Sequence, residues 1–351
     1  MIYVGDFMRK NKAYVNKELL NWYDQHARVL PWRDNPTPYR VWISEIMLQQ
    51  TRVEAVRSYF ERWMLKAPDV FTLSLLSLDE INKLWEGLGY YSRARNILKA
   101  SKIIVKQYDG ILPSSKHLLE ELPGIGPYTS GAISSIAFNQ KETAVDGNVL
   151  RVFARLSANK NDIKDHSTKK EIKQMVYDVL PENRVGDFNQ SLMELGATVC
   201  LPNGKPKCVF CPLMDICESF KQNLTSVIPV KQKKKAQRIE KITVLLIIKD
   251  KLVTIKKRPS TGLLASLYEY PNVDYHMTKD ELALLYPNSE IVPLPDAKHV
   301  FTHIIWRMKG FAIFVKDDDL YKDHIWATQD DIINTYTIPT AFKAYTKIIL
   351  K

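Results

Sequence analysis

The hydrophobic pattern of the chain changes once, near residue 225, and this change restricts the folds open to it. Before that point apolar residues recur at helical spacing, as in residues 44–63, where we expect one helix starting near Ser44. After it, residues 242–258 contain two runs rich in β-branched residues on either side of a Lys249–Asp250 turn, which predicts a hairpin. The pattern predicts a mainly helical N-terminal domain followed by a smaller α+β domain.

A basic segment separates the two patterns. Residues 230–241 carry six basic residues and one acid, which is typical of an exposed linker. We therefore predict a helical domain over residues 1–228, a basic linker over 229–241 and an α+β domain over 242–351. Within the last domain we expect a second strand pair in residues 299–315 that turns at Gly310, and helices near residues 278–286 and 339–350.

Charge and segment composition limit the classes of function. The 351 residues carry a formal net charge of +11, which suits a polyanionic partner but also fits a basic protein that binds none. The first twenty residues lack the apolar run of a signal peptide, and no run reaches transmembrane length. We expect a cytoplasmic protein with no membrane partner, in a compartment where clustered thiols are metal ligands more often than disulfides.

All four cysteines lie within residues 200–217, in the spacing C-x7-C-x2-C-x5-C. A zinc ribbon usually offers two separated C-x2-C pairs, and only one is present here. A single short loop with four thiolates can instead wrap an iron–sulfur cluster. The spacing favours a cluster over zinc and leaves disulfides as the weakest alternative. The set is Cys200, Cys208, Cys211 and Cys217.

Residues 118–138 read as a helix, a turn with Gly124 and Gly126, and a second helix. Such a turn leaves backbone N–H groups free for a phosphate oxygen, although an ordinary helical hairpin has the same pattern. Two carboxylates stand near such segments. Taken alone, Asp146 reads as a helix cap or an Asp-Gly turn, and Glu45 as part of a solvated helix face.

Together these strings resemble the MutY-type adenine DNA glycosylases, which belong to the helix-hairpin-helix, iron–sulfur superfamily of DNA repair glycosylases. "LPWRDNPTPYRVWISEIMLQQTRV", "WEGLGYYSRARN", "LPGIGPYTSGA", "AVDGNV", the four cysteines and "HVFTH" occur in the family's order over nearly the whole chain. The resemblance implies a helix-hairpin-helix glycosylase domain with an iron–sulfur loop, followed by a Nudix-like domain. It also implies a monomeric enzyme that flips adenine paired with 8-oxoguanine or guanine out of double-stranded DNA and excises it, leaving an abasic site.

The same resemblance implies the catalytic residues. Glu45 would protonate adenine, for which burial must raise its pKa, and Asp146 would stabilise or transiently trap the cationic sugar. Asn148 would orient the reacting groups, and Tyr128 would contact the Asp146 region. The related endonuclease III has a lysine at the position of Tyr128, and a phenol cannot form that lysine's Schiff base, so we expect no strand cleavage.

The remaining implied residues bind DNA or the cofactor. The four cysteines would hold a [4Fe-4S] cluster, although the loop has one residue more than usual between Cys200 and Cys208. The C-terminal domain lacks the acidic helix of Nudix hydrolases and would read 8-oxoguanine. Alone, its "FTH" string reads as an ordinary strand fragment, and Tyr90 as a core residue. The DNA-binding set comprises Arg28, Leu30, Trp32, Arg33, Gln49, Gln50, Thr51, Tyr90, Gly124, Gly126, Gln190, Phe301, Thr302 and His303.

Three other functions remain open at this level. One is an endonuclease III-like lyase for oxidised pyrimidines, which Tyr128 and the additional domain argue against. Another is a non-catalytic DNA-binding protein with a structural cluster, which the presence of both Glu45 and Asp146 in matching contexts argues against. The third is a nucleotide hydrolase of the Nudix type, which the missing acidic helix argues against.

Overall fold

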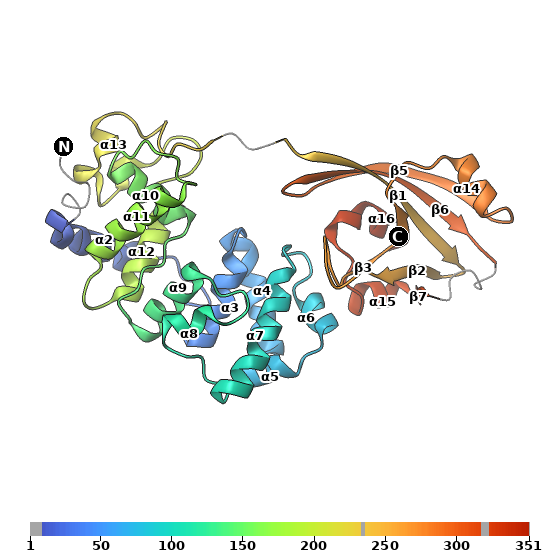
Figure 1. The fold of residues 1–351 in the computed structure, drawn as a ribbon, viewed down its shortest axis with the longest axis horizontal. Coiled ribbons are helices and arrows are strands. Elements are labelled where there is room, and N and C mark those ends of the chain that lie inside the picture. The colour runs from blue at the N-terminus through green and yellow to red at the C-terminus, as the bar shows by residue number, and fades with distance from the viewer. Residues whose placement is uncertain (1–8, 233–235, 317–322, 351) are drawn as a thin grey trace. The chain divides into compact units, whose positions relative to one another are not determined.

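The computed structural model of the chain describes residues 9–232, 236–316 and 323–350 (Figure 1). Contacts divide the chain into two units, Met1–Ser74 with Lys99–Lys233, and Leu75–Leu98 with Lys234–Lys351. The second unit thus includes a segment from within the N-terminal half. The boundaries of the domains and linker that we drew from the sequence stay predictions, and residues 233–235 of that linker lie outside the described part of the chain.

Helices build the first unit, as the sequence predicts. They are α2 (Lys12–His26), α3 (Pro38–Leu48), α4 (Val53–Lys66), α5 (Val70–Leu75), the later part of α7 (Ser92–Tyr108), α8 (Lys116–Glu120), α9 (Pro127–Phe138), α10 (Gly147–Leu156), α11 (His166–Val179), α12 (Val185–Thr198) and α13 (Glu218–Lys221). Within the described ranges, no helix combines the length and the apolar character that crossing a membrane requires.

The prediction of one helix over residues 44–63 was wrong, because the chain forms two helices there. Helix α3 begins six residues before Ser44, where Thr37 accepts a hydrogen bond from the Arg40 N–H and Pro38 occupies the first turn. It ends at Leu48, and Gln50 adopts a left-handed conformation with φ of 57°. The polar residues 49–52 therefore belong to neither helix and form the connection between α3 and α4.

The predicted helical hairpin is present as α8 and α9. Gly124 has φ of 82°, a conformation that a side chain would strain, so this glycine makes the turn. Gly126 has ordinary backbone angles, and open space surrounds the position of an added Cβ. Pro127 starts α9 directly after it. The beginning of α9 therefore has room for a close partner.

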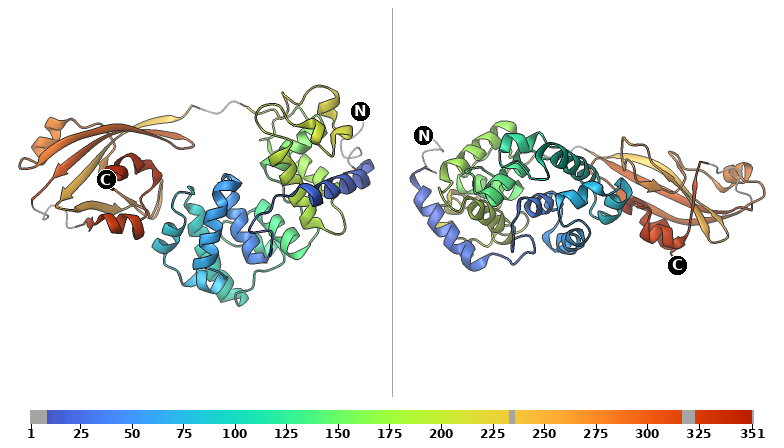
Figure 2. Two further views of the ribbon diagram at one scale, coloured as in Figure 1. Left: turned by 180° about the vertical axis from the view of Figure 1, so that it is seen from behind. Right: turned by 90° about the horizontal axis from the view of Figure 1, so that it is seen from below.

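Helices α2, α10, α11 and α12 share one apolar core, with α2 lying against the helices that follow α9 (Figure 2). Asp146 caps α10, since its carboxylate accepts from the backbone N–H groups of Asn148 and Val149. The prediction of a cap at Asp146 is confirmed. Because the cap is attached to a buried helix, its carboxylate has a defined position at the start of α10.

A mixed sheet dominates the second unit. Its strand order is β3-β2-β1-β6-β5, with β4 on β1 and β7 on β2, and among the strand pairs in the described residues only β1 and β6 run parallel. The helices of this unit are α6 (Leu78–Leu84), the start of α7, α14 (Lys279–Leu285), α15 (Gln329–Asn334) and α16 (Lys343–Ile349). The strands are β1 (Arg238–Lys249), β2 (Leu252–Lys257), β3 (Tyr268–Glu269), β4 (Asn272–Val273), β5 (Glu290–Val300), β6 (Ile304–Phe314) and β7 (Ile325–Ala327).

Successive side chains of β1 point to opposite faces of the sheet, and each face is covered by its own core. Val244 and Leu246 join a core with residues of α15 and α16, whereas Leu245 and Ile247 join a second core that includes Leu282 of α14. Figure 1 shows α15 and α16 near one face of the sheet and α14 near the end of β5 and β6. The predicted hairpin of β1 and β2 is confirmed, with Lys249 opposite Leu252.

Two details of the second unit differ from the sequence prediction. Strand β1 begins at Arg238, inside the segment expected to be linker, because residues 238–241 pair with the start of β6. The second strand pair turns at residues 301–303, where the Phe301 N–H donates to the Ile304 carbonyl, and not at Gly310. Gly310 lies inside β6, opposite Val244 of β1 and Leu294 of β5, and the ring of Tyr345 packs over it.

The packing at Gly310 gives a stability prediction. An added Cβ would lie 2.2 Å from Cε1 of Tyr345, so Gly310→Ala should lower the free energy of unfolding of the second unit by about 1–3 kcal/mol. Urea denaturation followed by amide hydrogen exchange in β6 measures this loss. In the double variant Gly310→Ala/Tyr345→Leu the ring is gone, and the cost should be smaller than the sum of the two single costs. Additive costs would contradict the proposed clash.

Candidate active site

One cavity of about 780 Å³ in the first unit collects most of the residues that the sequence singles out. Its walls come from the loop after α2, the end of α3, the hairpin between α8 and α9, the start of α10, and α12. The predicted residues that line it are Arg28, Leu30, Trp32, Arg33, Glu45, Gln49, Gln50, Thr51, Gly124, Gly126, Tyr128, Asp146, Asn148 and Gln190. The break between α3 and α4 is what brings residues 49–51 to this wall.

Glu45 projects from α3 and is only 6% exposed, so the alternative of a solvated helix face is wrong. The Tyr128 hydroxyl donates a hydrogen bond of 2.5 Å to Glu45 Oε2 and also contacts Met193 Sδ at 3.6 Å. Burial raises the pKa of Glu45 to about 7, against the opposing effects of the Tyr128 hydrogen bond and the charge of Arg33. Near neutral pH this carboxyl group can hold a proton and release it.

Asp146 is also buried, but more hydrogen-bond donors reach its carboxylate. Three N–H donors converge on its carboxylate, from the backbone of Asn148 and Val149 at 2.8 Å and from Asn148 Nδ2 at 2.7 Å. Burial raises the pKa of Asp146, and these donors oppose that rise. Hydrogen bonds and the positive end of a helix both stabilise a carboxylate anion. Asp146 thus supplies a carboxyl group in a fixed position at the cavity wall, with donors that favour its anion.

The two carboxyl groups influence each other across the cavity, because the charge of Asp146 contributes to raising the pKa of Glu45. Glu45 is therefore suited to donate a proton, while the N–H donors around Asp146 favour the anionic form of that group. Pairs of titratable groups with divergent environments are typical of acid-catalysed cleavage of glycosidic bonds. The arrangement can protonate a leaving group on one side and stabilise a cation on the other.

Sequence reasoning missed a buried acid in the same cavity, Glu194 of α12, which is 1% exposed. Its carboxylate accepts from Arg28 Nε at 2.5 Å and from Arg33 Nη2 at 2.9 Å. Arg33 also donates to Gln190 Oε1 at 3.1 Å. The i,i+4 spacing of Gln190 and Glu194 in one helix could have indicated that they share a face.

Two arginines of α10 were missed as well. Arg151 donates to Asn148 Oδ1 at 2.9 Å and to the Cys200 carbonyl at 2.7 Å. One turn later, Arg155 donates to the Leu201 carbonyl at 2.9 Å and lies 3.3 Å from Cys200 Sγ. Helical spacing in "NVLRVFAR" could have indicated one face. Helix α10 therefore connects the cavity wall with the cysteine loop.

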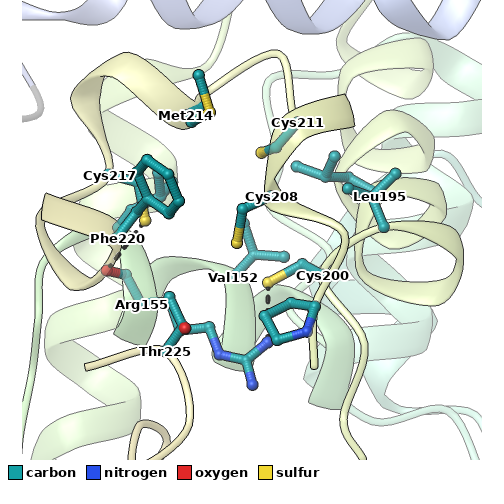
Figure 3. A pocket seen from close by; sticks show the side chains of 13 residues that line it. Val152, Arg155, Leu195, Cys200, Cys208, Cys211, Met214, Cys217, Phe220 and Thr225 are labelled. Atoms are coloured by element: carbon teal, nitrogen blue, oxygen red, sulfur yellow. Dashed lines mark hydrogen bonds between the residues drawn. The ribbon is translucent and has the colours of Figure 1, made fainter. Parts of the chain in front are cut away.

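The four cysteines are free thiols around one pocket that α10, α12 and the loop enclose (Figure 3). Apart from Arg155, its lining is mostly apolar, with Val152, Leu195 and Phe220 among the walls. Among the residues that the structure describes, no three His, Cys, Asp or Glu side chains come close enough together to hold a metal ion. The four thiols thus share a pocket without forming a ready site for a single ion.

The last four predicted residues lie in the second unit and line a separate cavity of about 490 Å³. Phe301, Thr302 and His303 form the turn between β5 and β6, so the alternative of a strand fragment is wrong. The Tyr90 hydroxyl lies 3.2 Å from Thr302 Oγ1. Tyr90 itself is 48% exposed and has φ of 48°, so it is not a core residue.

Comparisons with known families match both parts of the chain. Residues 43–177 match the family described as HhH-GPD superfamily base excision DNA repair protein. Residues 243–347 match the family described as NUDIX domain. The first match runs from within α3 to near the end of α11 and so includes the helical hairpin, Glu45 and Asp146. The second spans nearly all of the sheet and its helices.

Curated proteins and a solved structure extend this similarity. The chain is 39% identical to an adenine DNA glycosylase of Arabidopsis thaliana over 311 residues, which cover 77% of the chain and about half, 49%, of the plant protein. It is 36% identical to an adenine DNA glycosylase of Buchnera aphidicola over 310 residues, which cover 86% of the chain and 87% of that protein. A thermostable thymine-DNA glycosylase superposes with a TM-score of 0.54 at 27% identity, covering 63% of the chain and 100% of that structure.

We predict that substitutions of two neighbours of Glu45, Tyr128 and Asp146, shift the pKa of Glu45 in opposite directions. Tyr128→Phe removes a hydrogen bond that stabilises the Glu45 carboxylate, so the pKa of Glu45 should rise above 7. Asp146→Asn removes a negative charge that disfavours this carboxylate, so the pKa should fall below 7. Carbon-13 NMR of protein labelled at the glutamate carboxyl carbon measures both values, with Glu45→Gln assigning the signal. Shifts in the same direction would contradict this account.

Proposed function

Because the chain belongs to the family of adenine DNA glycosylases, we propose that it flips adenine paired with 8-oxoguanine or guanine out of duplex DNA and hydrolyses its N-glycosidic bond. The observation that carries this proposal is the pair of carboxyl groups in one cavity beside the helical hairpin, with Glu45 titrating near neutral pH. An adenine inside a duplex cannot reach such a cavity, so flipping must precede the reaction.

Glu45, in its protonated form, donates its proton to the ring nitrogen of the flipped adenine. The bond between the sugar C1′ and adenine N9 then breaks, and its electron pair leaves with the base. The positive charge on the sugar develops next to Asp146, which Asn148 and the start of α10 hold as an anion. Water adds to C1′ and gives a proton to the Glu45 carboxylate, which leaves an abasic site and restores the protonated acid.

Tyr128 supports hydrolysis without strand cleavage. Its hydroxyl is engaged with Glu45, and burial together with the neighbouring carboxylates raises its pKa well above the usual value, so it stays a neutral donor. A phenol also cannot form the Schiff base that a lyase needs. We therefore assign the chain to the monofunctional glycosylases and not to the lyases for oxidised pyrimidines.

Base recognition belongs to the wall formed by Leu30, Trp32, Arg28, Arg33 and Gln190. The two apolar side chains can pack on the faces of a purine ring, and the polar ones can bind its edge. In the segment after α3, Gln50 and Thr51 would enter the minor groove and fill the space that the base vacates, as Tyr90 would from the second unit. Gln49 is held by a hydrogen bond to Thr129 at 3.2 Å.

The turn of residues 301–303 is the proposed reader of 8-oxoguanine. It ends a strand pair on a covered sheet and presents the Thr302 hydroxyl, which can donate and accept hydrogen bonds. Phosphate contacts would come from the hairpin with Gly124 and Gly126 and from the basic surface of a chain with net charge +11. The protein would act as a monomer on the chromosomal DNA of the cytoplasm.

The cysteine pocket suits a [4Fe-4S] cluster held by Cys200, Cys208, Cys211 and Cys217. The donor set is four thiols with no carboxylate or imidazole in the lining, which is the ligand chemistry of such clusters. When bound, the cluster would supply a cross-link that holds the 200–217 loop together. Arg155, beside Cys200 Sγ, would balance part of the thiolate charge. The reaction needs no redox step from it.

An excision assay tests the proposed reaction. Purified protein is incubated with duplexes that contain adenine opposite 8-oxoguanine, adenine opposite guanine, or thymine glycol, and half of each sample is treated with hot alkali. Breaks should form at adenine only after alkali, because hydrolysis leaves an intact abasic strand. Glu45→Gln and Asp146→Asn should each lower the single-turnover rate by about 10²-fold or more while DNA binding persists.

A matched control is Glu182→Gln, which removes an exposed carboxylate of the same unit and should leave the excision rate unchanged. Near-normal excision by Glu45→Gln or by Asp146→Asn contradicts the catalytic assignment. Breaks without alkali, efficient trapping of the protein on DNA by borohydride, or cleavage at thymine glycol would favour the lyase instead.

The proposed cluster has its own test. Freshly purified protein should absorb broadly near about 400 nm and contain roughly four irons per chain. Cys211→Ala should lower the iron content and the unfolding temperature, because the loop loses its cross-link, whereas Lys207→Ala in the same loop should preserve both. Colourless protein with one zinc ion per chain would refute the cluster.

A further inference from the structure

Glu194 is a buried acid for which the proposed reaction has no direct use. It lies on α12 with 1% of its surface exposed, and both carboxylate oxygens are engaged. Arg28 forms a two-pronged contact, with Nε on Oε1 at 2.5 Å and Nη2 on Oε2 at 3.2 Å, and its backbone N–H adds a contact of 3.3 Å. Such planar pairing fixes the orientation of a guanidinium as well as its position.

The same carboxylate also holds the second arginine. Arg33 Nη2 donates to Glu194 Oε2 at 2.9 Å, while Nη1 donates to the Arg28 carbonyl at 3.0 Å. Its third nitrogen, Nε, donates to Gln190 Oε1 at 3.1 Å. Because the amide oxygen of Gln190 faces Arg33, the amide NH2 of that side chain faces away from Arg33, and Gln190 lines the cavity. The orientation of one carboxylate thus determines that of three other polar side chains.

We propose that Glu194 is the positioning residue of the base pocket, which holds Arg28, Arg33 and, through Arg33, Gln190 in their binding orientation before the base enters. This inference rests on the proposed function, since it assigns these three side chains to recognition of the flipped adenine. Glu194 does not touch the base itself in this account. Its two oxygens are already shared among Arg28 and Arg33, so the polar wall that faces the base consists of N–H donors.

Glu194 has a second, electrostatic consequence for Glu45. The titratable and charged groups that line the cavity with Glu45 are Arg28 and Arg33 from the loop after α2, Tyr128 of α9, Asp146 before α10, Lys169 of α11, and Glu194. Arg33 favours the ionised form of Glu45, and Glu194 is the partner that compensates its charge. Without that compensation, the pKa of Glu45 should fall, because the net positive charge of the wall increases.

The variant Glu194→Gln tests the positioning and electrostatic roles of Glu194 separately from its contribution to packing. It keeps the size of the side chain but replaces one acceptor oxygen with an NH2 group that faces guanidinium donors. The single-turnover rate on adenine opposite 8-oxoguanine should fall by about 10²-fold, the usual effect of a small misalignment. Affinity for the same duplex with 2′-fluoro-deoxyadenosine, which is not cleaved, should change less than about threefold, because backbone phosphates dominate it.

Glu54→Gln is the matched control, because Glu54 contacts the same Arg28 at 3.7 Å but its side chain is 77% exposed. An exposed ion pair contributes little, so this variant should excise adenine at the wild-type rate. A thermal unfolding curve accompanies each variant. An equal loss of rate in Glu54→Gln and Glu194→Gln, or a Glu194→Gln rate within about threefold of wild type, overturns the inference.

Rate profiles over pH supply a readout that a structural role alone would not move. Glu45 must be protonated to act, so the wild-type rate should fall as pH rises through about 7. In Glu194→Gln this fall should be centred at a lower pH. Arg33→Lys keeps the positive charge at position 33 and the negative charge of Glu194, but a lysine cannot make the three directed contacts of Arg33. The excision rate of this variant should therefore be lower, while the fall of that rate with rising pH stays centred at the wild-type pH. If the pH of this fall shifts equally in Glu194→Gln and Arg33→Lys, the proposed effect of the Glu194 charge on the pKa of Glu45 is contradicted.

Arg33→Lys also tests the inference if Glu194→Gln does not fold. A wild-type excision rate for Arg33→Lys would by itself contradict the proposal that the contacts from Glu194 through Arg33 to Gln190 position the base pocket. Failure of the proposed function gives a different result. In that case the wild-type protein releases no adenine from any duplex, whereas failure of the present inference leaves wild-type excision intact and removes only the differences between variants.

Discussion

The candidate site depends on removing one carboxyl group from water. Glu45 lies on a helix that is buried on nearly all sides, and desolvation raises its pKa to about 7. A carboxyl group at the usual pKa would be ionised in the cell and could not donate a proton. The helix around it supplies this environment with Trp42, Ile46 and other apolar side chains, so the packing of α3 is itself part of the chemistry. The hydrogen bond from Tyr128 limits the rise and keeps the proton transferable.

Helix α10 gives the second carboxylate its place and joins it to the rest of the unit. Asp146 caps the helix, Asn148 bonds both that carboxylate and Arg151, and Arg151 reaches the Cys200 carbonyl. Each of these residues satisfies an ordinary structural need, a cap or a buried polar partner. A structural cap and the proposed functional role of Asp146 are therefore compatible, because the N–H groups that the cap satisfies also favour its carboxylate anion at the cavity wall.

Much of the fold and the site could be predicted from sequence, because local chemistry determined them. The helical hairpin, the cap at Asp146, the β1–β2 hairpin and the helices α14 and α16 follow from glycine, capping and periodicity signals. Glu194 could not be found this way. Its partner Arg28 is 166 positions away in sequence, and a lone glutamate in an amphipathic helix reads as a solvated residue until the tertiary structure buries it.

The two elements that sequence reasoning placed wrongly have a common physical cause. Residues 44–63 keep a helical repeat through the break at 49–52, and residues 299–315 keep an extended pattern through the turn at 301–303. In both, the hydrophobic pattern continues across the break, so the pattern alone does not mark where the chain turns. Each break exposes polar residues to a cavity. A polar segment that interrupts an otherwise periodic pattern, such as Gln49–Thr51, is thus better read as a turn at a binding surface than as a tolerated irregularity.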